Sequence, residues 1–323
     1  MTTNEGLAEP TSLKEIEERF TAWATDQPDV RAALVVGSRA RADHPADPFS
    51  DLDLVVVAND PARYLDATDW LGAMGTVWVT FVEETAVGGG RERRVLFAGG
   101  QDVDFAIFPT DLFRHLARLL WLRRLRPAYA LVARDDRRRA EVALAAFGSV
   151  VRRGVRVLVD KDGAATRVVR TAKELPAPAA APPSEAEFLE AVNDFWYHAL
   201  WTVKKLRRGE LWTAHGCLDG SMKDLVLRMI GWQARATWGE EYDTWHDGRF
   251  LEDWAAPRAV AGLRAAFAHY DGDDMRRALV ATMDLFRALG TDTARRLDYA
   301  YPTDADEHVT RLVTGLLARP KAT

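Results

Sequence analysis

The chain has 323 residues, of which 48% are hydrophobic and 28% charged, and its formal net charge is −5 at pH 7. This length is enough for two domains, and the composition is that of a globular protein with a sizeable core. The negative charge argues against binding of nucleic acid, because surfaces that bind a duplex are normally basic.

Cysteine content and hydropathy indicate the compartment. The one cysteine, Cys217, excludes an internal disulfide, which suits the reducing cytoplasm. The first residues have neither a basic nor an apolar segment of the kind that directs export. No uncharged apolar run approaches the roughly 18 residues that a membrane span requires. We therefore expect a cytoplasmic protein without a membrane segment.

The first half of the chain alternates between strand and helix patterns. Apolar runs of strand length predict strands over 30–36, 52–57, 76–82, 94–97, 102–108 and 155–159. Apolar residues at helical spacing predict helices near 12–24, 61–73 and 110–126. Residues 1–173 should therefore form a mixed α/β domain.

The pattern changes after residues 174–183, ELPAPAAAPP. Proline and alanine favour an extended backbone, so this segment is predicted to be a semi-rigid linker. Ser184 and Glu187 then fit a capping box at the start of a helix. Helical spacing continues through 219–237, 257–269 and 273–299. Residues 184–323 should form an almost wholly helical domain.

Two aspartates, Asp51 and Asp53, lie at the start of the predicted strand 52–57. Side chains alternate along a strand, so both carboxylates should lie on one face. Two ionised carboxylates this close repel each other unless a cation lies between them. Mg²⁺ suits such a pair, because it prefers oxygen ligands and usually shares its coordination with substrate phosphates.

The turn after the first predicted strand has the sequence Gly-Ser-Arg. Gly37 permits a tight turn, and the Ser38 hydroxyl with the local amides could hold a phosphate. Arg39 and Arg41 could neutralise more of its charge. The sequence therefore places a candidate phosphate site shortly before the candidate metal site.

A third carboxylate should complete the metal site. In QDVDFAIFP, Asp102 and Asp104 lie at the start of another predicted strand and should face the same way. We favour Asp104, because the apolar residues 105–108 follow it directly. This choice assumes that its strand lies beside the strand of Asp51 and Asp53, which the spacing alone does not establish.

Each motif also has a simpler explanation. An Asp-x-Asp pair most often marks a strand entry or a turn, and the charged loop 39–50 could be a solvated connection. The ordered set of strand, Gly-Ser, Asp-x-Asp at the start of a strand and a later aspartate at the start of another favours a nucleotide and metal site.

In this order, GSRAR, SDLDLVVV and DVDFAIF resemble the nucleotidyltransferase signature of the DNA-polymerase-β-like superfamily. Further strings resemble the aminoglycoside 6-adenylyltransferases (streptomycin adenylyltransferases) and cover nearly the whole chain in order. They are DWLGAMG at 69–75, VLVDKDG at 157–163, NDFWYHALWTVKKLRRGEL at 193–211, DLVLRMIGWQ at 224–233 and LFRALGTDTARRLDYAYP at 285–302. The chain departs from the family in Leu52, where relatives often have an aromatic residue, in the loop before it and in the linker.

The resemblance implies an α+β fold, with an N-terminal nucleotidyltransferase domain built on a mixed sheet, a C-terminal helical domain and a site in the cleft between them. It also implies transfer of AMP from ATP to a hydroxyl of an aminoglycoside, with release of pyrophosphate. By position, Asp51, Asp53 and Asp104 would bind Mg²⁺. Gly37 and Ser38 would bind the nucleotide phosphates.

Two cationic residues and a base complete the expected site. Lys204 falls at a lysine of the family and would reach the triphosphate from the first helix of the second domain. Arg39 matches the family's Gly-Ser-Arg and is a further candidate for the phosphates. The acceptor hydroxyl would attack the α-phosphorus in line, and a carboxylate would accept its proton. Asp104 is the first candidate for this base, with Glu83 or Glu84 as the alternative.

The second domain is expected to bind the acceptor. An aminoglycoside is polycationic and rich in hydroxyls, so carboxylates and aromatic faces should contact it. The segment 238–254, WGEEYDTWHDGRFLEDW, mixes three tryptophans with six carboxylates. It could also be an ordinary amphipathic surface with core tryptophans. DGDD at 271–274 is predicted to begin a helix rather than to bind a ligand.

Two other functions remain open from the sequence. The same chemistry could act on another small hydroxylated metabolite, a protein or a tRNA end, although the acidic second domain favours a cationic small molecule over RNA. The chain could instead be a non-catalytic relative that binds a nucleotide. The chain keeps the whole set of Ser38, Asp51, Asp53, Asp104 and Lys204, which argues against that, because such a protein has no need of two adjacent metal carboxylates. A monomer is expected, since the two domains of one chain can form the site.

Overall fold

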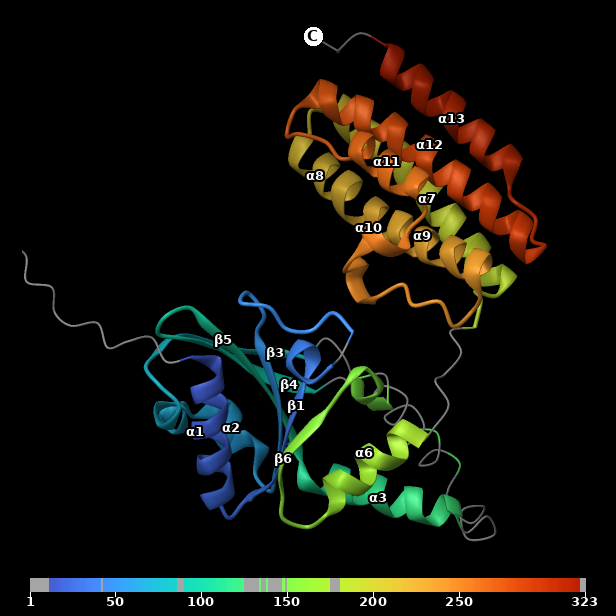
Figure 1. Cartoon of the computed structure of the whole chain (residues 1–323). Coiled ribbons are helices and arrows are strands. Elements are labelled where there is room, and N and C mark those ends of the chain that lie inside the picture. Colours follow the sequence, from blue (N-terminus) through green and yellow to red (C-terminus); the bar gives the residue numbers. More distant parts are fainter. Residues whose placement is uncertain are drawn as a thin grey trace, which may run out of the picture. The chain divides into compact units, whose positions relative to one another are not determined.

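A computed structural model describes residues 12–41, 43–85, 90–124, 150–174 and 181–319, together with positions 134, 138, 147 and 148. The chain forms two compact units, Met1–Pro178 and Ala179–Thr323 (Figure 1), and each is described by itself. Residues 175–180 of the predicted linker and the last two residues of the predicted helix 110–126 lie outside the described residues.

The first unit is built around one six-stranded sheet with the order β3-β4-β5-β2-β1-β6. The strands β2 and β5 are parallel, whereas the other neighbouring pairs are antiparallel. The mixed sheet that the family resemblance implied is therefore confirmed. The strands are β1 (Val30–Val36), β2 (Leu52–Ala58), β3 (Val77–Glu84), β4 (Arg91–Phe97), β5 (Gln101–Pro109) and β6 (Arg156–Asp160).

Helices cover both faces of the sheet, as Figure 1 shows. One face packs against α1 (Leu13–Asp26), α2 (Pro61–Asp66) and the short 3₁₀ helix η2 (Asp69–Ala73). The other packs against α3 (Thr110–Arg124) and α6 (Ala164–Glu174). Side chains alternate along each strand, so β1 and β2 contribute apolar residues to both layers. This explains their nearly unbroken valine-rich sequences.

Two predicted elements differ from the structure, and one helix of the structure was not predicted. The predicted helix 61–73 is two helices, because the backbone is extended at Ala67, whose carbonyl accepts a hydrogen bond from Trp70 Nε1 at 3.0 Å. The predicted strand 94–97 begins earlier, at Arg91, because its charged side chains find partners on neighbouring strands. The helix α6 was not predicted, although its buried residues recur at helical spacing.

The second unit is helical among its described residues, as predicted. The capping box of its first helix is confirmed: the Glu187 amide donates to Ser184 Oγ, and the Ser184 amide donates to Glu187 Oε2. None of the described helices of the chain is long and apolar enough to span a membrane. The helices are α7 (Glu185–Arg207), α8 (Leu211–Gly216), the π turn η3 (Cys217–Ser221), α9 (Met222–Trp238), the 3₁₀ turn η4 (His246–Gly248), α10 (Leu251–Trp254), α11 (Pro257–Ala266), α12 (Gly272–Leu297) and α13 (Thr303–Ala318).

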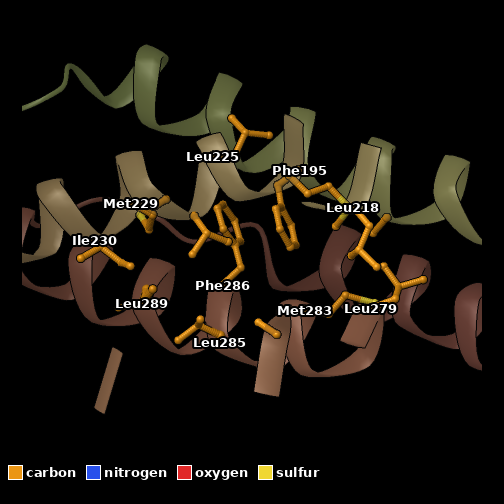
Figure 2. Close-up of a cluster of buried hydrophobic side chains, with 14 of the residues drawn as sticks. Phe195, Leu218, Leu225, Met229, Ile230, Leu279, Met283, Leu285, Phe286 and Leu289 are labelled. Carbon is orange, nitrogen blue, oxygen red and sulfur yellow. The ribbon is translucent and has the colours of Figure 1, made fainter. Parts of the chain in front are cut away.

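Large apolar side chains from α7, α9 and α12 form the core of this unit (Figure 2). The rings of Phe195 and Phe286 stack in this core with their centroids 3.7 Å apart, and both are fully buried. Met229 and Leu289 pack beside them. All of these residues lie in the second unit, so it has a hydrophobic core of its own.

Candidate active site

Three carboxylates meet at one end of the parallel strands β2 and β5. In this ladder Asp53 lies opposite Asp104, and Asp51 immediately precedes β2. One oxygen from each of the three carboxylates lies within 4.8 Å of the others. Asp104 is buried, and the other two are partly exposed. Because parallel strands begin at the same edge of a sheet, both strand starts bring their aspartates to one place.

Asp104 lies in surroundings that disfavour its charge. Burial raises the pKa of Asp104 to about 7. The Arg94 guanidinium, 3.4 Å from Asp104 Oδ2, lowers this pKa, whereas the carboxylates of Glu92, Asp102 and Asp51 raise it. Asp104 Oδ1 is buried and has no hydrogen-bond partner among the described residues. The one nearby guanidinium therefore does not offset burial and the neighbouring carboxylates, and an ionised Asp104 would have no hydrogen-bond donor for Oδ1 among the described residues.

The turn after β1 closes against this cluster. It is the 3₁₀ turn η1 (Gly37–Ala40), which begins at Gly37 with φ +68°. A Cβ on Gly37 would lie 1.8 Å from Asp53 Oδ2, so only glycine fits here while Asp53 keeps its position. Ser38 Oγ is also buried, and within the described part of the chain it has no hydrogen-bond partner. The Ser38 hydroxyl is therefore available to a ligand, and it lies next in the chain to Gly37, which contacts Asp53 of the cluster.

Arg39 connects this turn to the start of β2. Its Nε donates to the carbonyl of Asp51 at 2.9 Å, and its Nη2 donates to that of Ser50 at 3.1 Å. These bonds hold the loop that presents the first aspartate. They use two of the five N–H groups of a guanidinium, so Arg39 can still contact a phosphate.

Lys204 belongs to the second unit, on α7, and its side chain is exposed. The next residue, Lys205, lies 2.6 Å from a carboxylate oxygen of Glu210 and over the ring of Trp201. The two lysines therefore differ in their surroundings. The expected contact of Lys204 with the triphosphate stays a prediction.

The residues of the cluster fit a hard divalent cation. They supply three carboxylates with their oxygens close together, and one of those oxygens lacks a donor among the described residues. A divalent ion between them would relieve both the repulsion and the missing contact. Mg²⁺ usually takes one or two protein carboxylates and completes its coordination with water and phosphate oxygens. The donor set therefore suits a metal–nucleotide complex.

Two residues beside the cluster were missed from the sequence, Arg94 and Glu92. Arg94 Nε lies 2.6 Å from Glu83 Oε1 and 3.3 Å from Glu92 Oε1. Arg94 thus connects Asp104 with two carboxylates of β3 and β4. The signal was the alternating charge in RERR just before an apolar run, which indicates a strand whose charged side chains pair with its neighbours.

The acidic, tryptophan-rich segment 238–254 of the second unit borders a pocket of about 480 Å³. Trp245, Trp254 and Asp247 line it together with residues of α9, whereas Trp238 is exposed. The segment therefore contributes both to the core and to a pocket. At 271–274 the predicted cap is confirmed, because Asp271 accepts hydrogen bonds from the backbone of the next turn and begins α12.

A Gly-Ser turn against paired aspartates, with a third aspartate on the parallel neighbour, is the arrangement expected of nucleotidyltransferases. The chain belongs to the streptomycin adenylyltransferase family, whose family model matches residues 11–316. It is therefore a nucleotidyltransferase enzyme. The family predicted from the sequence is confirmed.

Two relatives match over nearly the whole chain. An aminoglycoside 6-adenylyltransferase of Bacillus subtilis (strain 168) is 22% identical over 320 residues, which are 96% of this chain and 99% of that protein. One of Campylobacter jejuni is 22% identical over 312 residues, 94% of each chain. A crystal structure of an aminoglycoside 6-adenyltransferase from Bacillus subtilis covers 97% of this chain and all of that one at 19% identity, with a TM-score of 0.43.

Proposed function

We propose that this enzyme transfers AMP from Mg·ATP to a hydroxyl of a streptomycin-like aminoglycoside and releases pyrophosphate. The main observation in support is the cluster of Asp51, Asp53 and Asp104, whose oxygens lie within 4.8 Å of one another. The names of the full-length relatives support an aminoglycoside as the acceptor. The family match supports adenylyl transfer.

The side chains of the cluster would bind and orient the nucleotide. Mg²⁺ held by Asp51, Asp53 and Asp104 would neutralise charge on the triphosphate when bound. The Gly37–Ser38 turn would hold the phosphates through backbone amides and the Ser38 hydroxyl. Lys204 and the uncommitted N–H groups of Arg39 would add positive charge.

The reaction would be an in-line displacement. The acceptor hydroxyl forms a bond to the α-phosphorus while the bond to the leaving pyrophosphate breaks. The hydroxyl proton passes to a carboxylate, for which Asp104 is the first candidate. Glu83 is the alternative, because Arg94 joins it to Asp104 on the same part of the sheet. Much of the catalysis then comes from positioning and from charge stabilisation.

We also propose that the enzyme works in the cytoplasm as a monomer, with ATP and a cationic small molecule as its partners and without a nucleic acid. One chain contains all of the residues assigned above. The net charge of −5 supports a cationic partner over a nucleic acid.

The test is pyrophosphate release from Mg·ATP against a panel of aminoglycosides that includes streptomycin. We expect release that depends on streptomycin and falls at least about 100-fold in Asp53→Ala, because a metal carboxylate is lost. Asp111→Ala is the matched control, since the Asp111 side chain is 96% exposed on α3. Pyrophosphate release by Asp53→Ala at the wild-type rate would show that Asp53 is not a ligand of the catalytic metal. If the wild-type enzyme binds ATP but releases no pyrophosphate with any aminoglycoside, the proposed acceptor would be contradicted.

A further inference from the structure

A row of side chains crosses the sheet from the metal cluster to the edge strand β3. In the ladders, Asp53 lies opposite Asp104, Asp104 opposite Arg94, and Arg94 opposite Phe81. Directly paired residues present their side chains on the same face of a sheet. Phe81 is therefore two strands away from Asp104, about 10 Å at the usual strand spacing. It belongs to the same face as the metal carboxylates.

The β3 end of this face exposes apolar side chains. Phe81 is 50% exposed, and Val79, two residues before it on the same side of the strand, is 53% exposed. Elsewhere the same face is packed, because α3 and α6 bury the valines of β1 and β2. Half-exposed phenylalanine and valine beside a buried carboxylate form a surface suited to an apolar ring face.

Carboxylates lie on either side of the apolar strip formed by Val79 and Phe81. On one side, Val79 is opposite Leu96, which is opposite Asp102. On the other side, Glu83 is opposite Glu92. Glu83, Glu92 and Asp102 are thus three carboxylates outside the proposed metal ligands.

These three carboxylates share the positive charge of one residue, Arg94, which contacts Glu83 at 2.6 Å and Glu92 at 3.3 Å. The four side chains have a net charge of −2 when all are ionised. Burial raises the pKa of both Glu92 and Asp102, so the negative charge of this surface is greatest above the pKa values of these two carboxyls. This surface therefore complements a cation.

We propose that β3 carries the acceptor subsite of the first unit, where Phe81 and Val79 pack against a ring of a cationic, hydroxyl-bearing acceptor and Glu83 binds its ammonium or guanidinium group. This inference rests on the proposed function, and it adds an acceptor contact in the first unit to the one expected in the second. Arg94 is a positioning residue here, since it holds Glu83 beside the row that leads to Asp104. A molecule with several rings spans the distance from this surface to the cluster.

The direct test is calorimetric titration of the full-length protein with streptomycin in the absence of nucleotide, so that no turnover occurs. We expect Phe81→Ala to raise the Kd for streptomycin about 3- to 10-fold, because ring contacts are lost. Glu83→Gln should raise it about 10-fold or more, because a charged partner is lost. Phe81→Tyr should keep near-normal binding. Trp121→Ala is the matched control, because that ring is 60% exposed on α3 of the same unit.

Steady-state kinetics provides the second readout. Phe81→Ala should raise the KM for streptomycin while the KM for ATP and the melting temperature stay unchanged. Unchanged Kd in both variants, with a wild-type enzyme that adenylylates streptomycin, would overturn this inference alone. An equal loss for streptomycin and ATP would also overturn it, because it would show a structural role. A wild-type protein that neither binds nor modifies any aminoglycoside would overturn both this inference and the proposed function.

Discussion

Asp104 is proposed to bind a metal ion as a carboxylate, yet its surroundings favour the protonated, uncharged form. Its side chain is buried, one oxygen lacks a partner among the described residues, and its pKa is raised to about 7. Without a metal, the folded protein therefore keeps a proton on Asp104 at pH values where the unfolded chain has lost it. Such a group contributes stability at low pH and loses that contribution as the pH rises through 7.

This environment predicts how Asp104→Asn changes stability with pH. In EDTA, the asparagine variant should gain stability over the wild type between pH 5 and pH 8, by on the order of 1–3 kcal/mol, because the wild type must ionise a buried carboxyl. Urea unfolding at both pH values measures this difference. Asp111→Asn, at an exposed position, should show none. A stability difference that does not change with pH would show that the pKa of Asp104 is not raised in the folded protein.

At the scale of elements, the pairing of β2 with β5 determines the site. The sequence predicted both strands and the aspartates at their starts, because alternating and apolar patterns are local. It could not predict that the strands are neighbours, since this pairing depends on the packing of the whole sheet. The same limit explains why Arg94 was not predicted as a site residue. It contacts Asp104 only because β4 pairs with β5, and no local pattern in the sequence indicates that pairing.

Local signals were sufficient at helix starts. The capping box at Ser184 was predicted and is present, with the Glu187 amide 3.2 Å from Ser184 Oγ. Helix α6 has buried residues at helical spacing but no capping box at its start, and the break at Ala67 depends on the tertiary burial of Trp70. Caps are predictable from sequence because both partners lie within four residues, whereas breaks that serve the core are not.

The cap gives a prediction for α7. Ser184→Ala should lower the free energy of unfolding by about 1 kcal/mol, because the first turn loses a hydrogen-bond acceptor. Chemical denaturation measures the change. Ser221→Ala is the control, since Ser221 precedes α9 but makes no side-chain cap hydrogen bond. Equal effects of the two substitutions would show that the observed cap does not stabilise the helix.

At the scale of the whole molecule, the proposed function assigns roles to residues of both units, the carboxylates of the first and Lys204 of the second. The family was recognised because its motifs extend through both units. The acceptor was less accessible from sequence, because polar and aromatic surface residues such as Phe81 and Trp245 have no periodic signature that separates ligand contacts from ordinary surface.

Lys204→Ala tests whether the second unit contributes to nucleotide binding. We expect it to raise the KM for ATP about 10-fold, because a cation beside the triphosphate is lost. Lys205→Ala is the matched neighbour, since Lys205 is already paired with Glu210 at 2.6 Å, and its KM should stay near normal. Steady-state pyrophosphate release measures both variants. Wild-type KM and turnover in Lys204→Ala would exclude this lysine from the site.

The most direct measurement of the central claim is mass spectrometry of streptomycin after incubation with the enzyme, ATP and Mg²⁺. The proposed function predicts a product heavier by one adenylyl group, formed only with Mg²⁺ and lost in Asp51→Asn, whose fold should be intact. Unmodified streptomycin after prolonged incubation with wild-type enzyme that binds ATP would contradict it, as would full conversion by Asp51→Asn.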